Sequence, residues 1–146
     1  MIVQYYEDLA VGETHEAGPR TVTEEEIVEF AEKYDPQSFH VDREAAESSM
    51  FGGLAASGWH TAAVAMRLLV DGFFEDVAIG GALGVDDLRW RRPVYAGDEV
   101  SISVTVADKE IWDEGRGRVE FDLEAANQDD VTVHTRTELV LVFRED

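Results

Sequence analysis

The feature that most restricts the fold is the apolar stretch at 59–70, which directly follows Ser57 and Gly58. It consists mostly of alanine, valine, leucine and methionine, and Arg67 is its one charged residue. In helical geometry these residues are apolar on all sides, which is typical of a helix enclosed by the rest of the protein. We therefore predict a long buried helix that ends at Asp71-Gly72.

Five stretches of the chain are predicted to be β-strands. Within 99–111, small hydroxyl residues alternate with Ile102, Val104 and Val106, a period of two that suits a sheet with one buried face. Turn sequences between the later stretches favour antiparallel pairing, and Gly80-Gly81 is interpreted as a further turn. The predicted strands are 13–22, 82–92, 99–111, 118–127 and 131–143. They predict one α+β domain over 1–146, with a curved antiparallel sheet wrapped around the buried helix.

An amphipathic helix is predicted to begin after Thr23. Thr23 and Glu26 form a capping box, and apolar residues follow at helical spacing through Ala31. Because Pro36 disfavours helical geometry at Asp35, this helix should end near 34. The stretch after His40 is expected to hold one or two short helical turns, capped by Asp42.

Charge and composition exclude several classes of protein. The net charge of −20 repels phosphate backbones, so we expect no nucleic-acid partner. The large acid excess, together with only two lysines, suggests adaptation to a salt-filled cytoplasm, as in halophiles. The chain has no cysteine, and we see no leader or membrane-spanning segment, so a cytoplasmic location is expected.

Asp35 and His40 are the candidate catalytic pair. They stand five residues apart in a segment that Pro36 prevents from being regular helix, shortly before the glycine that opens the apolar helix. Taken alone, this spacing fits a loop-stabilising Asp-Pro turn better than catalysis. The motifs further along the chain favour catalysis.

Three motifs in order resemble the MaoC-like dehydratase family, which includes the (R)-specific enoyl-CoA hydratases. They are DPQSFHVD at 35–42, AASGWHT at 55–61 and RPVYAGD at 92–98. The resemblance covers nearly the whole chain and implies a hotdog fold. It also implies that Asp35 and His40 are catalytic and that the backbone N–H of Gly58 faces the thioester oxygen. Further expected substrate contacts are Ser38, Phe39, Ser57 and Trp59.

The chemistry of these groups agrees with that resemblance. Adding water to an enoyl thioester requires a base for the water, an acid for the α-carbon and donors for the enolate oxygen. An imidazole titrates near neutral pH, so His40 suits water activation. Asp35 would donate the proton if burial raised its pKa. Gly58, at a helix start, supplies a free N–H and the positive end of the helix dipole.

Three arginines are concentrated before the last motif, at Arg89, Arg91 and Arg92. One interpretation is local pairing with Asp86, Asp87 or Asp98. The other is a clamp for the phosphates of coenzyme A, because guanidinium groups bind phosphate in bidentate fashion. Alternation predicts that Arg89 and Arg91 share one strand face.

The remaining histidines do not suggest a second site. His60 is expected to be a hydrogen-bonded core residue rather than a catalytic one, and His15 and His134 lie in predicted strands. No spacing resembles a zinc site, so no metal is expected, and coenzyme A enters only as part of the substrate.

The sequence thus predicts an acyl-CoA hydratase or dehydratase, which adds water to a trans-2-enoyl-CoA to give a 3-hydroxyacyl-CoA, as in fatty acid metabolism. A hotdog thioesterase and a non-catalytic acyl-thioester-binding module are the alternatives. The predicted sheet has an edge strand, and edges are commonly covered by a second copy, so we expect a homodimer. Whether dimers assemble further is left open.

Overall fold

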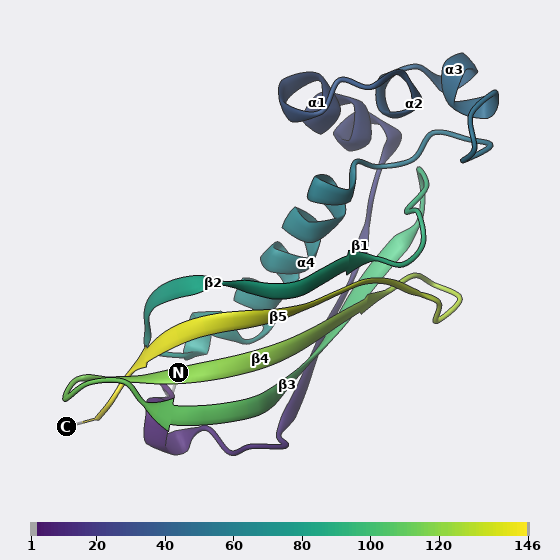
Figure 1. The fold of residues 1–146 in the computed structure, drawn as a ribbon. Helices are drawn as coiled ribbons and strands as arrows, with labels where there is room; N and C mark the ends of the chain where they lie inside the picture. The colour runs from purple at the N-terminus through teal and green to yellow at the C-terminus, as the bar shows by residue number, and fades with distance from the viewer. Residues whose placement is uncertain (1–2, 146) are drawn as a thin grey trace.

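The structure is a computed structural model that describes residues 3–145. One antiparallel sheet curves around the long helix α4 (Gly58–Gly72), as Figure 1 shows. The sheet order is β1-β3-β4-β5-β2, so β1 and β2 are its edges. The strands are β1 (Thr14–Thr21), β2 (Ile79–Trp90), β3 (Glu99–Ile111), β4 (Arg116–Ala126) and β5 (Thr132–Phe143). The predicted α+β architecture is confirmed.

The start of β2 differs from the prediction. Gly80 and Gly81 lie inside the strand, which begins at Ile79 rather than after a turn. Gly81 has φ of +141°, and the pairing of β2 with β5 shifts register beside it. The two glycines therefore mark an irregularity in an edge strand. Glycine suits this place because it can adopt the positive φ that other residues rarely adopt.

Helix α4 is buried on one side only, which corrects the predicted helix enclosed on all sides. His60, Thr61, Val64, Ala65, Leu68 and Leu69 are buried, whereas Trp59 is 57% exposed, Met66 37% and Val70 38%. The five-stranded sheet of a single chain covers only the face of α4 turned toward it. The other apolar face is left open.

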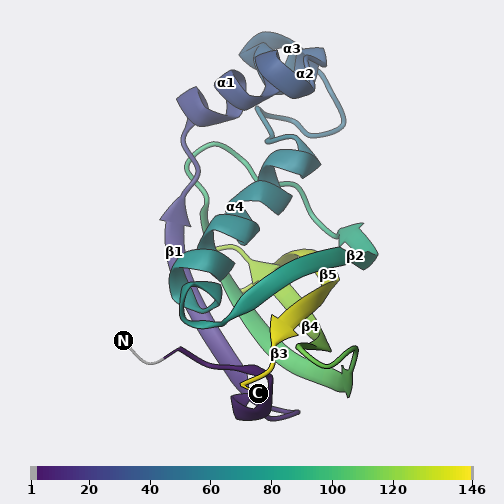
Figure 2. The same ribbon diagram turned by 90° about the vertical axis from the view of Figure 1, so that its left-hand side faces the viewer.

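A helical excursion joins β1 to α4 and stands at one end of the sheet, as Figure 2 shows. It contains α1 (Glu24–Tyr34), α2 (Ser38–Val41) and α3 (Arg43–Glu47). Thr23 Oγ1 accepts a hydrogen bond from the Glu26 N–H at 3.2 Å, as the capping motif predicts. Helix α1 ends at Tyr34, before Pro36, and Asp42 caps α3 by accepting from the Glu44 N–H at 3.0 Å.

Three polar residues alternate on the buried face of β5. Arg136 connects them, because its guanidinium donates to His134 Nε2 at 2.9 Å and to Glu138 Oε1 at 3.3 Å. It also donates to the Ala62 carbonyl of α4 at 3.1 Å. Since His134 Nε2 accepts, Nδ1 carries the proton and donates to the Arg89 carbonyl at 3.1 Å. The network joins α4 to the sheet.

Within residues 3–145, the helices are too short or too polar to cross a bilayer.

Candidate active site

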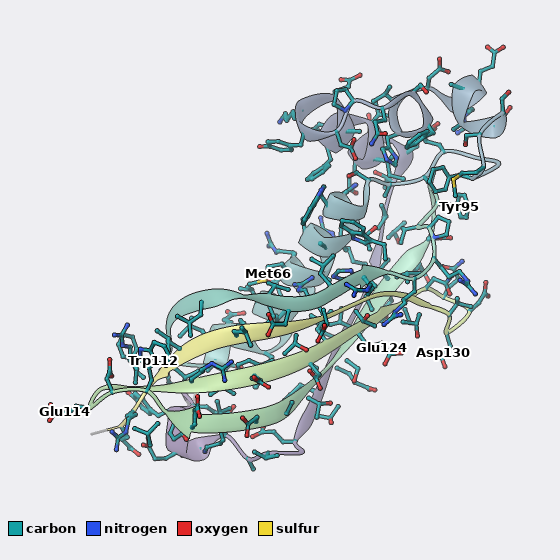
Figure 3. All side chains as sticks on the ribbon, viewed as in Figure 1. Met66, Tyr95, Trp112, Glu114, Glu124 and Asp130 are labelled. Carbon is teal, nitrogen blue, oxygen red and sulfur yellow. The ribbon has the colours of Figure 1, made fainter. Side chains whose placement is uncertain are left out.

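A pocket of about 600 Å³ lies where the excursion meets the start of α4 and the segment after β2. Tyr95, labelled in Figure 3, belongs to this end of the molecule. The pocket brings together all three groups predicted to act in catalysis: Asp35, His40 and Gly58. Its other lining residues are Gln37, Met50, Phe51, Ala56, Trp59, Thr61, Trp90, Arg91, Arg92, Pro93 and Val94.

Asp35 caps the C-terminus of α1 and is held by two side chains. Ser57 Oγ donates to Oδ2 at 2.7 Å, and Gln37 Nε2 donates to Oδ1 at 2.6 Å. Burial acts to raise the pKa of Asp35, but these two hydrogen bonds and the nearby His40 imidazole together outweigh it and hold the pKa below its usual range. Asp35 is therefore ionised at neutral pH. The expectation that burial would make it the proton donor at the outset is wrong.

His40 lies in the single turn of α2 and is buried. Its Nδ1 is 2.6 Å from the carbonyl oxygen of Ala55. A carbonyl can only accept, so Nδ1 carries a proton, and in the neutral form of the ring Nε2 has a free lone pair. Nε2 is 3.5 Å from Asp35 Oδ2. Two acceptors therefore face each other across a gap longer than a hydrogen bond.

Gly58 is the first residue of α4, where a backbone N–H has no partner inside the helix. Ser57 caps this helix by accepting from the Trp59 N–H at 3.3 Å while it donates to Asp35. Among residues 3–145, no acceptor lies within hydrogen-bond range of the Gly58 N–H. Gly58 lines the same pocket as Asp35 and His40.

The structure separates the other predicted contact residues into two groups. Trp59, Arg91 and Arg92 line the pocket. Ser38, Phe39, Ser57 and Arg89 do not. Ser57 is fully buried behind Asp35, and Phe39 packs edge-on against the His40 ring, with centroids 4.6 Å apart. Both support the catalytic groups from outside the pocket.

The arginines have no partner among the predicted aspartates. Arg91 Nε donates to Thr135 Oγ1 at 3.2 Å, and Arg89 and Arg92 each donate to a backbone carbonyl. Within the described part of the chain, none of the three forms an ion pair. Arg91 follows the end of β2, and its side chain contacts Thr135, the residue that pairs with Arg89 across the sheet. The two arginines therefore lie on the same side of the sheet, as the alternation predicts.

Thr61 and Trp90 are among the lining residues that the sequence did not predict. Trp90 ends β2, and a Cβ built on Gly58 would overlap its indole ring. Trp90 stands between Arg89 and Arg91, so the alternation that puts these arginines on one face puts Trp90 on the other, and this was the available signal. Thr61 is one helical turn after Ser57, so it shares a face of α4 with it.

His60 lies outside this pocket. Its ring stacks on Phe30 of α1 with centroids 4.9 Å apart and planes 9° apart. Its Nδ1 is buried and has no hydrogen-bond partner in the described residues. His60 is therefore a core residue, as predicted, but its Nδ1 does not form the expected hydrogen bond. Burial lowers the pKa of His60, which keeps the ring neutral.

Comparisons with known proteins agree with this geometry. A family model described as MaoC like domain matches residues 8–128. YdeM, an uncharacterized protein of Bacillus subtilis, is 32% identical over 139 residues, which are 94% of this chain and 98% of YdeM. The crystal structure of a MaoC-like dehydratase from Rhodospirillum rubrum is 39% identical, with a TM-score of 0.86, and covers 98% of this chain and 99% of its own.

Two further solved structures share the fold. A monoamine oxidase regulatory protein from Archaeoglobus fulgidus is 31% identical, with a TM-score of 0.93 over 100% of this chain and 98% of its own. The (R)-hydratase PhaJ1 of Pseudomonas aeruginosa is 24% identical, with a TM-score of 0.76 over 97% and 86%. The fold is therefore the hotdog fold, as predicted, and the class is that of the hydratases and dehydratases. The chain belongs to the MaoC-like dehydratase family.

Proposed function

We propose that this protein catalyses the reversible addition of water to a trans-2-enoyl-CoA, giving a 3-hydroxyacyl-CoA. The observation that carries the proposal is the 3.5 Å gap between His40 Nε2 and Asp35 Oδ2. Both atoms are hydrogen-bond acceptors, because Nδ1 holds the imidazole proton and Asp35 is ionised. A water molecule that donates one O–H to each acceptor has its oxygen lone pairs left free for attack.

The proposed reaction moves one proton from water to carbon. As the water oxygen bonds to the β-carbon, one O–H bond breaks and its proton passes to Asp35. The double-bond electrons move toward the thioester oxygen and form an enolate. Asp35 then delivers the proton to the α-carbon, which collapses the enolate and restores the carboxylate. His40 holds the water throughout and accepts its second O–H.

Gly58 supplies the donor for the enolate oxygen in this scheme. Its N–H is free at the start of α4, where the helix dipole favours negative charge. Removal of one such donor typically costs about 100-fold to 1000-fold in rate. Arg91 and Arg92, which line the pocket and form no ion pair with any residue of 3–145, are proposed to bind coenzyme A phosphates. Arg89 lies outside the pocket and is not assigned this role.

The experiment follows the loss of the enoyl-thioester absorbance of crotonyl-CoA in molar KCl. We expect loss with the natural protein and none with His40→Ala or Asp35→Asn. Asp129→Asn, in the exposed turn before β5, is the matched carboxylate control and should retain activity. Near-normal rates in both site variants would refute the proposal.

Thioester hydrolysis is the second candidate, because an ionised Asp35 can serve it as well as hydration. A carboxylate beside the pocket can act as base for water that attacks the thioester carbonyl. Free thiol would then appear while the enoyl group persists, so a thiol reagent run in parallel separates the two reactions. Stabilisation by ligand with neither product would indicate a binding module instead.

We further propose that the protein works as a homodimer joined through β2 and α4. β2 pairs only with β5 among the described strands, and its exposed residues include Leu83 and Val85. The open face of α4 adds Met66 and Val70. Sedimentation should give twice the chain mass for the natural protein and a single chain for Val85→Lys, because a charge blocks edge pairing. Val11→Lys is the exposed control, and a monomeric natural protein would contradict the proposal.

A further inference from the structure

Trp90 is in contact with the backbone of Gly58. A Cβ atom built on Gly58 would overlap the indole at Cδ2, Cε2 and Nε1. The indole therefore occupies the space that a side chain at position 58 would need. Trp59 meets the same ring edge-on, with ring centroids 5.0 Å apart and planes at 83°. Both tryptophans line the pocket.

An irregularity in β2 directs Trp90 toward the pocket. Val85 pairs with Glu138 and Trp90 with His134, so the register slips by one residue between them. Glu138 and His134 share the face of β5 that lies under α4. Asp87, at φ +52°, is in this slip. Without the extra residue, the period of two would turn Trp90 to the opposite face of the sheet.

The position of the indole matters because of where the thioester would bind. If the thioester oxygen accepts from the Gly58 N–H, the α-carbon is two bonds from that oxygen. A substituent on the α-carbon then lies within side-chain distance of whatever covers Gly58. In this chain Trp90, a rigid aromatic ring, covers it.

We propose that Trp90 determines specificity by excluding thioesters that carry a substituent on the α-carbon. The inference rests on the proposed function, because it uses the thioester orientation set by Gly58. The selected substrates are thioesters whose α-carbon bears hydrogen only, and an α-methyl group collides with the indole. A pocket wall of this kind typically discriminates one methyl group by about 10-fold to 200-fold.

The test compares kcat/KM for crotonyl-CoA and for its α-methyl counterpart, tiglyl-CoA. The natural protein should prefer crotonyl-CoA by at least about tenfold, and Trp90→Ala should reduce this preference to within about threefold. Trp90→Phe, which keeps a smaller ring, should give an intermediate ratio and guards against loss of folding. Trp112→Ala is the control, because Trp112 is exposed on the distant β3–β4 hairpin (Figure 3) and should leave the ratio unchanged.

A binding measurement separates failure of this inference from failure of the proposed function. The shift in Tm caused by butyryl-CoA and by 2-methylbutyryl-CoA requires no turnover. The natural protein should be stabilised more by butyryl-CoA than by 2-methylbutyryl-CoA, and Trp90→Ala equally by both. Equal stabilisation of the natural protein by both thioesters, or an unchanged preference in Trp90→Ala, overturns the inference even if hydration occurs. If the expected Tm shifts are found but crotonyl-CoA is not hydrated, the role of Trp90 in specificity is supported and only the hydratase assignment fails.

Discussion

Ser57 Oγ donates a 2.7 Å hydrogen bond to Asp35 Oδ2 and accepts one from the Trp59 N–H. One buried hydroxyl thus connects the C-terminal end of α1 with the N-terminal end of α4. It sets both the position and the charge of the carboxylate in the pocket. The same atom satisfies an N–H of the first turn, next to the free N–H of Gly58.

Ser57→Ala should shift the pH dependence of the reaction. Asp35 must be ionised to accept a proton from water, and its lowered pKa keeps it ionised down to acid pH. Loss of the Ser57 hydrogen bond raises that pKa, so the acid limb of kcat/KM moves to higher pH. We expect kcat/KM to fall by about tenfold on the plateau, which corresponds to one lost charged hydrogen bond.

The measurement is a pH–rate profile of the natural protein, Ser57→Ala and Ser48→Ala. Ser48 is exposed after α3 and serves as the matched control. A purely structural role for Ser57 would lower the rate without moving the limb.

His60→Phe should retain catalysis. The ring lies against Phe30 outside the pocket, and Nδ1 is buried without a partner. Phenylalanine preserves the stack and removes the unsatisfied nitrogen, so the free energy of unfolding should rise by about 1 kcal/mol. Chemical denaturation and kcat/KM together check this. If the variant is folded but its kcat/KM is reduced more than tenfold, His60 takes part in catalysis and this prediction is wrong.

His134 makes stability depend on pH. Burial, aided by the Arg136 guanidinium, lowers the pKa of His134 to about 4. The unfolded chain therefore binds this proton first as pH falls, and the folded state loses stability between about pH 6.5 and pH 4. At pH 5 the loss attributable to His134 is about 2 kcal/mol relative to pH 7.

Comparison with His134→Gln isolates this contribution from that of the carboxylates. Glutamine can accept from Arg136 and donate to the Arg89 carbonyl, and it does not titrate. The free energy of unfolding of the variant should therefore fall less than that of the natural protein between pH 7 and pH 5. Parallel curves would show that His134 does not cause the dependence.

Salt should stabilise the protein. With a net charge of −20, the folded chain repels itself, and ions screen this repulsion. We expect Tm to rise steadily between about 0.1 M and about 3 M KCl. A triple variant with exposed Glu25, Glu32 and Glu47 changed to glutamine should start at a higher Tm and rise less steeply. A flat response of the natural protein would refute adaptation to high salt.

The elements with strong local signals were predictable from the sequence. The alternation in 99–111 gives the bounds of β3 without error, and Thr23, Pro36 and Asp42 mark helix ends where the structure has them. The grouping of Asp35, His40 and Gly58 in one pocket also followed from the motifs. These features depend on neighbouring residues and on short-range capping.

Other features depend on contacts between distant segments. The register slip at Asp87 is set by the pairing of β2 with β5, and without it the side of the sheet that Trp90 occupies could not be predicted. The charge of Asp35 depends on Ser57, 22 residues away, whose hydrogen bond acts together with Gln37 and His40 against the effect of burial. Exposure of one face of α4 follows from how far the sheet curves, which no local pattern encodes.

The bond from His40 Nδ1 to the Ala55 carbonyl has an evolutionary consequence. Every residue type at position 55 offers the same carbonyl, and the short bridge between Ala55 and Tyr95 anchors that part of the main chain. The acceptor that orients the imidazole is therefore the same whichever side chain stands at position 55. Lineages can diversify the pocket wall, and with it the compounds they process, while this bond to the main chain is retained.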